Sequence, residues 1–181
     1  MEKFFNPEEM KNAFYLFDDE EDKEQIMDMK NLTQAVILCG LPGSGKSTFV
    51  KKNCYDYVQI SRDIIRYELG YVSSPEEKVR LTREQEERVT DVEYKMIKTC
   101  LKKKKNFVVD DTNTSLYYRT KMLDYIKQWD DVFIIGVNFN TPVSVCIRRR
   151  KGQIPAEDIR NIADRMVPIS RDEVDDLIEV D

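Results

Sequence analysis

The 181-residue sequence contains no histidine. This absence excludes sites that depend on imidazole, such as Ser-His-Asp triads, zinc sites with histidine ligands and HExxH metalloproteases. The longest apolar run, residues 35–39, is far shorter than the roughly 20 residues of a membrane-spanning helix. The N-terminus also lacks a basic stretch followed by an apolar one, so no secretory signal and no membrane contact are expected. Because histidine is absent, any general base must be a carboxylate, lysine, cysteine or tyrosine.

Cysteine is sparse, and the four cysteines form no CxxC pair: Cys39, Cys54, Cys100 and Cys146. Such usage is typical of reduced thiols, so a cytoplasmic location is expected. Hydrophobic residues make up 41% and charged residues 35% of the chain, as in soluble globular proteins. At this length roughly 70% of the unfolded surface can be buried, so the core of a single domain needs no disulfide or metal.

The net charge of −5 is unevenly distributed. Residues 1–30 carry ten acidic side chains and four lysines, whereas the region from there to the acidic C-terminal tail is basic. A basic body suits phosphorylated ligands. We interpret residues 1–33 as an acidic and aromatic extension and residues 34–181 as one domain. The extension is either one or two helices packed on the domain or an arm that binds a partner or a second copy.

From residue 34 onward, short apolar segments alternate with amphipathic ones. The expected strands cover residues 35–39, 57–60, 107–109, 132–139 and 177–180. The expected helices cover residues 46–52, 61–69, 82–104, 115–129, 141–151 and 155–166. The first apolar run is continuous, as in a strand buried on both faces of a parallel sheet. This alternation predicts a three-layer α/β domain around a mostly parallel sheet of five strands.

Residues 40–47, GLPGSGKS, match the phosphate-binding pattern GxxxxGK[ST] between an apolar strand and a helix. In this pattern backbone N–H groups surround a β-phosphate, the lysine reaches the β/γ oxygens and the final hydroxyl can bind Mg²⁺. The expected ATP-binding residues are Gly43, Ser44, Gly45, Lys46, Ser47 and Thr48. GTPases, ATPases and kinases all use this loop, so it predicts a nucleotide site without identifying the reaction.

Asp63 and Arg66 follow the second expected strand, three residues apart at the start of a helix, and so share one face. A carboxylate beside an arginine can accept the proton of a hydroxyl while the arginine holds a neighbouring phosphate. The alternative interpretation is a helix cap with a surface ion pair. Ligands in parallel sheets bind at the carboxyl ends of the strands, which favours the functional interpretation.

The third expected strand ends in DDTN, residues 110–113. An aspartate at such a strand end commonly orders the Mg²⁺ coordination sphere or the phosphate loop, and we favour Asp111 over Asp110 for this role. Thr112 and Asn113 offer short hydrogen-bonding side chains on the acceptor side of the crevice. An ordinary turn is the alternative interpretation of this segment.

Four consecutive cations, Arg148 to Lys151, follow the fourth expected strand. An arginine here can fold over the nucleotide and stabilise charge on the transferring phosphoryl group. Four adjacent side chains cannot all face one ligand, so the choice among them stays open, with Arg149 as our selection. The lysines of residues 102–105 are interpreted instead as a solvated helix end.

The segments GLPGSGKST, SRDIIR, DDTN and RRRKGQIPAEDIR together resemble the polynucleotide 5′-kinase family, a branch of the adenylate-kinase-like P-loop phosphotransferases. The resemblance covers residues 35–166, and SRDxxR followed by DTN is its more specific part. It implies a P-loop kinase fold with a helical lid over residues 148–166. It also implies that Asp63 is the general base, that Arg66 binds the acceptor phosphate and that Thr112 lies toward the acceptor. Lys46, Ser47 and the lid arginines would then bind ATP and Mg²⁺.

The expected function is therefore transfer of the γ-phosphoryl group of ATP to a 5′-hydroxyl end of RNA or DNA. The lid departs from the family pattern, because the segment before Pro155 is short and the usual four-residue spacing of two arginines is not evident. No phosphatase or ligase module follows, so a stand-alone kinase is expected. Two alternatives remain: a kinase for a sugar, nucleoside or antibiotic hydroxyl, and a nucleotide-dependent interaction protein. The oligomeric state is not predicted.

Overall fold

A computed structural model of the chain describes residues 32–181, so our interpretations of the N-terminal extension lie outside the described residues. Within that range five strands form one sheet in the order β2-β3-β1-β4-β5, and all four pairings are parallel. The strands are β1 (Thr33–Cys39), β2 (Val58–Ile60), β3 (Phe107–Val109), β4 (Val132–Phe139) and β5 (Asp176–Val180). The predicted three-layer fold around a parallel five-stranded sheet is thereby confirmed.

The helices are α3 (Lys46–Asn53), α4 (Arg62–Glu68), α5 (Arg83–Lys102), α6 (Leu116–Ile126), α7 (Val143–Arg149), α8 (Ala156–Ala163) and the 3₁₀-helix η1 (Arg171–Glu173). Two predicted helices, 115–129 and 155–166, end three residues earlier than expected. Each finishes in a tighter turn, in which Trp129 N donates to Ile126 O and Met166 N donates to Ala163 O. Such three-residue hydrogen bonds often close the last turn of a helix. The 3₁₀-helix η1 was not predicted from the sequence.

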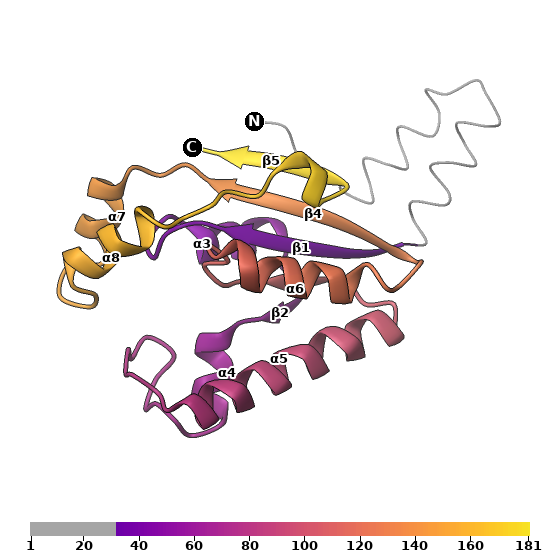
Figure 1. The fold of residues 1–181 in the computed structure, drawn as a ribbon, viewed down its shortest axis with the longest axis horizontal. Coiled ribbons are helices and arrows are strands. Elements are labelled where there is room, and N and C mark those ends of the chain that lie inside the picture. The colour runs from indigo at the N-terminus through magenta and orange to yellow at the C-terminus, as the bar shows by residue number, and fades with distance from the viewer. Residues whose placement is uncertain (1–31) are drawn as a thin grey trace.

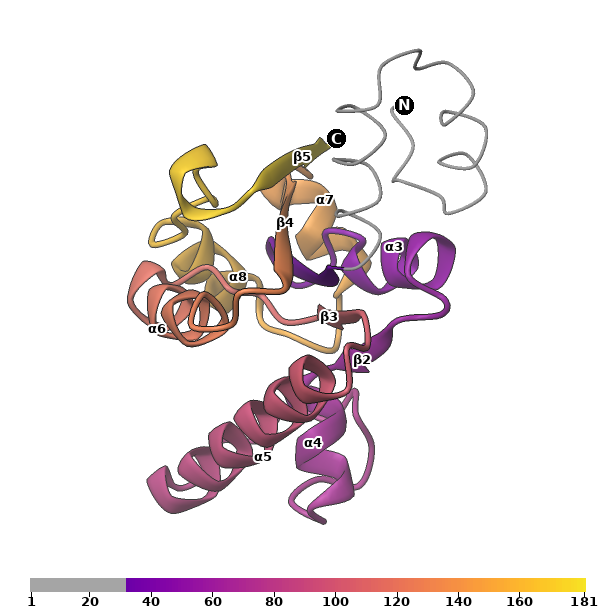
Figure 2. The same ribbon diagram turned by 90° about the vertical axis from the view of Figure 1, so that its right-hand side faces the viewer.

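Both faces of β1 are buried, which explains its unbroken apolar sequence. Alternate residues of β1 enter two separate cores. Ala35, Ile37 and Cys39 pack with residues of α4, α5 and α6, whereas Val36 and Leu38 pack with residues of α3. Figure 2 shows α3 and α6 on opposite sides of the sheet. Between residues 32 and 181, no helix is both long and apolar enough to cross a bilayer.

Helices α7 and α8 form a separate small layer at the end of the sheet where the strands finish (Figure 1). Its core is Leu41 from the phosphate loop, Cys146 of α7 and Ile159 of α8. The two helices therefore pack directly against the phosphate loop, which is the position expected of a lid.

A buried arginine joins this end of the sheet to the C-terminal segment. Arg119 of α6 is 1% exposed, and its Nε and Nη2 donate to the two carboxylate oxygens of Glu173 at 2.8 and 2.9 Å. Its Nη1 donates to the carbonyl oxygens of Asn113 and Val167 at 2.7 and 2.8 Å. Arg119 thus ties the DDTN segment to the chain that leads from α8 into β5.

Candidate active site

The phosphate loop occupies the turn between β1 and α3. Gly43 and Gly45 have φ values of 85° and 110°, a region that side chains with a Cβ rarely adopt. A Cβ on Gly43 would also lie 3.0 Å from the carbonyl oxygen of Cys146 in α7. The Gly40 N–H donates to the Thr112 carbonyl oxygen at 3.0 Å, which connects the loop to the end of β3. The glycines are therefore required both by the turn and by the close approach of the lid.

Lys46 lies inside the loop rather than extending into solvent. Its Nζ donates to the carbonyl oxygens of Gly40 and Leu41, both at 2.8 Å, and the residue is 8% exposed. Burial lowers the pKa of Lys46 to about 8, and the carboxylates of Asp110 and Asp111 oppose that shift. The loop thus holds a buried cation at the position where the pattern places nucleotide phosphates.

Of the two carboxylates, Asp110 opposes the lowering of the Lys46 pKa more strongly. Asp110 Oδ2 accepts a hydrogen bond from Gln59 Nε2 at 2.8 Å. Burial raises the pKa of Asp110, while Lys46 and hydrogen bonds from Gln59 and Ser47 counter the shift. The structure therefore places Asp110 beside Ser47, although the sequence analysis favoured Asp111. Sequence adjacency hid this difference, because two successive residues at a strand end point in opposite directions.

Asp111 instead contacts the start of α4. Its Oδ1 accepts a hydrogen bond from the Arg62 backbone N–H at 3.0 Å, while Ser61, the residue at the N-cap, provides no side-chain cap. Oδ2 of Asp111 is buried without a hydrogen-bond partner. Burial and the nearby Glu93 raise the pKa of Asp111 to about 8. Asp111 thus caps α4 from the end of the neighbouring strand.

Asp63 lies in the first turn of α4, one residue after the amide that Asp111 caps. Its Oδ1 accepts from Arg66 Nη1 at 2.9 Å, and its Oδ2 pairs with the Lys78 ammonium of the loop between α4 and α5. The Asp63 side chain is 40% exposed, so an incoming group can reach it. Asp63 and Arg66 share one helix face as expected, and they form the ion pair that the alternative interpretation described. The contact with Lys78 was not predicted.

A network of charges on α5 supports the start of α4. Glu86 accepts from Arg62 at 2.8 Å and from Arg66 at 3.1 Å, and buried Glu93 accepts from Arg62 at 2.7 Å. Glu86 and Glu93 lie seven residues apart on one helical face. That spacing was readable in the sequence, but nothing there indicated which cations the glutamates would meet. The network orients Arg66 relative to Asp63.

The remaining acceptor-side residues differ in what they contact. Thr112 presents its carbonyl oxygen to Gly40. The Asn113 side-chain amide donates to the Leu38 carbonyl oxygen at 2.8 Å, and the Asn113 backbone has a φ of 44°. Asn113 is one of the residues that tolerate this left-handed conformation most readily. Its side-chain amide nitrogen therefore holds the turn against β1.

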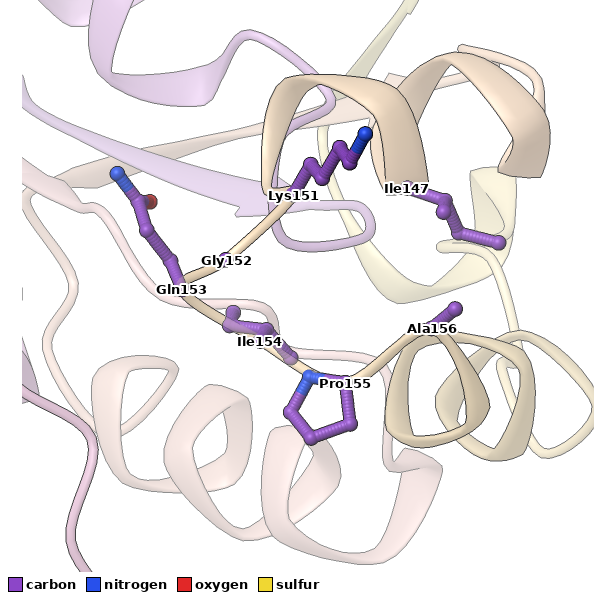
Figure 3. A pocket seen from close by; sticks show the side chains of 7 residues that line it. All are labelled: Ile147, Lys151, Gly152, Gln153, Ile154, Pro155 and Ala156. Atoms are coloured by element: carbon purple, nitrogen blue, oxygen red, sulfur yellow. The ribbon is translucent and has the colours of Figure 1, made fainter.

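The lid cations take distinct directions. Arg149 Nη1 donates to the Gly43 carbonyl oxygen at 3.0 Å, so its guanidinium lies on the phosphate loop. Arg150 donates to Gln153 Oε1 at 2.9 Å. Lys151 lines a cavity of about 470 Å³ between the end of α7 and the start of α8, together with Ile147 and residues 152–156 (Figure 3). Arg149 is therefore the cation whose guanidinium contacts the loop directly.

The site as a whole brings together two functional halves at the carboxyl ends of β1, β2 and β3. One half contains Lys46, Ser47, Asp110 and Arg149 around the phosphate loop. The other contains the exposed Asp63 carboxylate with its two cationic neighbours. Lys46 and Asp63 are both close enough to perturb Asp110 electrostatically. Such an arrangement can bind nucleotide phosphates on one side and a hydroxyl-bearing molecule on the other.

Comparisons with known proteins identify the family and the fold. Residues 36–167 match the AAA_33 family model, which is described as an AAA domain. The chain is 32% identical over 144 residues to the L-seryl-tRNA(Sec) kinase of Methanococcus maripaludis, a match that covers 72% of this chain and 51% of that protein. The chain thus spans about half the length of this curated relative.

Solved structures show the same architecture. The Pnkp1/Rnl/Hen1 RNA repair complex superposes with a TM-score of 0.65 at 26% identity, over 75% of this chain and 44% of the matched chain. A putative kinase from Chloroflexus aurantiacus superposes with a TM-score of 0.63 at 17% identity, over 83% of this chain and 86% of that one. The second likeness concerns the fold alone. With its parallel sheet, its phosphate loop and a family match over most of its length, this chain belongs to the AAA_33 family and has the P-loop kinase fold.

Proposed function

We propose that this protein is an ATP-dependent polynucleotide 5′-hydroxyl kinase. The observation that carries the proposal is the placement of Asp63, an accessible carboxylate paired with Arg66 at the sheet edge that also bears the phosphate loop. A carboxylate can accept the proton of an alcohol, and an adjacent arginine can bind the phosphate that follows a 5′-terminal nucleoside.

The donor side would bind ATP through the backbone N–H groups of residues 43–48, with Lys46 on the β- and γ-phosphates. The hydroxyl of Ser47 lowers the pKa of the adjacent Asp110 carboxyl, and both side chains offer oxygen ligands of the kind that Mg²⁺ prefers. These two residues would hold the ion directly or through water, in place of the Asp111 role that we expected. A bound Mg²⁺ neutralises charge on the phosphates.

In the proposed reaction, the 5′-oxygen of the acceptor forms a bond to the γ-phosphorus as the bond to the β,γ-bridging oxygen breaks. Asp63 takes the proton of the hydroxyl, and ADP leaves with the electron pair of the broken bond. Arg149, which contacts Gly43, would stabilise charge on the transferring group. Alignment of the two substrates in a single site supplies much of the acceleration in reactions of this type.

Two comparisons support a nucleic-acid acceptor over a small molecule. One relative is named for a kinase that acts on an aminoacylated tRNA, and one structural neighbour belongs to an RNA repair complex. The tRNA kinase relative makes a hydroxyl on charged tRNA the second candidate acceptor. The alternative acceptor that is not a nucleic acid is a small molecule with a hydroxyl group, such as a sugar, a nucleoside or an antibiotic.

The proposal is tested by incubating the protein with γ-labelled ATP, Mg²⁺ and separate acceptors. The panel contains 5′-OH RNA and DNA oligonucleotides, seryl-tRNA, nucleosides and simple sugars. We expect label on the 5′-OH oligonucleotides and none on oligonucleotides that already carry a 5′-phosphate. Label on seryl-tRNA or sugars alone, or release of ADP with no labelled product, would contradict the proposal.

A further inference from the structure

The loop between α4 and α5 places a second cation on the Asp63 carboxylate. Arg66 Nη1 contacts Oδ1 at 2.9 Å, and the ammonium of Lys78 contacts Oδ2. The two side chains of the Lys78–Asp63 pair are 37% and 40% exposed. The carboxylate thus lies between a cation of its own helix and a cation of the loop, and each of its oxygens has a partner.

The two cations differ in how firmly they are held. Arg66 also pairs with both carboxylate oxygens of Glu86, at 3.1 and 3.2 Å, and its side chain is 23% exposed. Lys78 comes from an exposed loop and reaches Asp63 across fifteen residues of sequence. Ion pairs between exposed side chains are weak, because water and side-chain entropy oppose them. Lys78 is therefore the partner that can move when an acceptor arrives.

We infer that Lys78, together with Arg66, binds the phosphate adjacent to the acceptor hydroxyl, an inference that rests on the proposed function. A hydroxyl that donates its proton to Asp63 must approach a carboxylate oxygen, and Oδ2 is the oxygen that Lys78 covers. The displaced ammonium can then pair with another anion close by. A phosphodiester beside the reacting hydroxyl supplies that anion, and a neutral sugar does not.

The same exchange favours a particular class of acceptor. An acceptor with a phosphate one nucleoside away from its hydroxyl replaces the ion pair that it breaks, so binding does not leave a cation or a carboxylate without a partner. An acceptor without that phosphate breaks the Lys78–Asp63 ion pair and offers Lys78 no new anion. Lys78 therefore adds to the preference for an acceptor that carries this phosphate.

Steady-state kinetics of Lys78→Met test this role. We expect the KM for a 5′-OH dinucleotide to rise about tenfold, while kcat and the KM for ATP change less than about threefold. Lys78→Arg should restore most of the acceptor KM, since it restores the charge. Arg80→Met removes an exposed cation two residues away in the same loop and is the matched control. An acceptor KM for Lys78→Met equal to that of Arg80→Met would overturn the inference.

A charge-neutral acceptor separates phosphate binding from a merely structural role of Lys78. The probe is a dinucleotide whose linkage is a methylphosphonate, with equilibrium binding to the protein measured by calorimetry in the presence of ADP. We expect Lys78→Met to weaken binding of the normal dinucleotide about tenfold and to leave binding of the neutral one unchanged. Equal weakening of both would overturn the inference. The binding measurement does not depend on phosphoryl transfer. Absence of transfer by the unsubstituted protein would contradict the proposed function but not the binding role of Lys78.

Discussion

The Oδ1 atom of Asp111 accepts a hydrogen bond from the backbone N–H of Arg62 at 3.0 Å, and this contact joins the end of β3 to the first turn of α4. The residue after Arg62 is Asp63, so the contact sets where the proposed base lies. A capping hydrogen bond normally comes from the residue at the helix start, but Ser61 does not provide one. The orientation of Asp63 therefore depends on the neighbouring strand.

Substitution of Asp63 by Asn should abolish phosphoryl transfer while nucleotide binding remains. The amide keeps the size of the side chain but cannot accept the acceptor proton, so we expect kcat to fall by about 10² to 10⁴. End-labelling of a 5′-OH oligonucleotide measures kcat, and titration with ADP measures binding. Glu68→Gln on the same helix is the control. Turnover within tenfold of the unsubstituted protein would show that another group is the base.

The two carboxylates at the end of β3 should behave differently when each is neutralised. Asp110 lies with Ser47 and Lys46, so Asp110→Asn should lower Mg²⁺-dependent turnover by at least about tenfold. Asp111→Asn should lower this turnover less than Asp110→Asn does, and it should also change the Mg²⁺ concentration for half-maximal activity less. Titration of activity with Mg²⁺ measures both. The reverse order would restore our original preference for Asp111 as the residue that organises the ion.

Asp111 should also make stability depend on pH. Its pKa is raised to about 8 from 3.8, so the folded state retains a proton that the unfolded state releases at lower pH. Stability contributed by this group therefore falls as pH rises from about 4 toward 8. Asp111→Asn removes that titration. As pH rises from 5 to about 8, the free energy of unfolding of the variant should therefore increase relative to that of the unsubstituted protein. Denaturant unfolding at the two pH values measures the change.

Nucleotide binding should weaken as pH rises through about 8, because Lys46 loses its proton there. The neutral amine attracts phosphate oxygens less than the ammonium does. We expect the Kd for ADP to rise several-fold between about pH 7 and pH 9 in the unsubstituted protein. Lys46→Met should bind ADP weakly at both values, without the pH dependence. A flat profile in the unsubstituted protein would show that Lys46 keeps its charge in the bound state.

Removal of the buried Arg119 should destabilise the domain. Arg119→Met removes the guanidinium that pairs with the Glu173 carboxylate and donates to three backbone carbonyl groups. Breaking a buried ion pair from one side typically costs about 3–5 kcal/mol. The free energy of unfolding in urea measures the loss. Lys104→Met, which removes an exposed pair with Asp131, should change it by less than about 1 kcal/mol.

Much of the fold was predictable because its signals are local. The continuous apolar sequence of β1 reflects a strand buried on both faces, and the glycine pattern of residues 40–47 reflects a turn that needs positive φ. The shared face of Asp63 and Arg66 was also predictable, since residues three apart on a helix face the same way. Each of these three features depends on residues that lie only a few positions apart in the sequence.

Other features depended on contacts between distant segments, and the tertiary structure alone decided them. From the sequence we favoured Asp111 over Asp110, but the strand end directs Asp110 toward Ser47 and Asp111 toward α4. The sequence presented four successive lid cations, of which Arg149 reaches Gly43 across 106 residues. The contact of Lys78 with Asp63 likewise depends on how the loop between α4 and α5 folds back. Periodicity and motif spacing determine which elements form and which edge carries the site, whereas side-chain partners follow from packing in three dimensions.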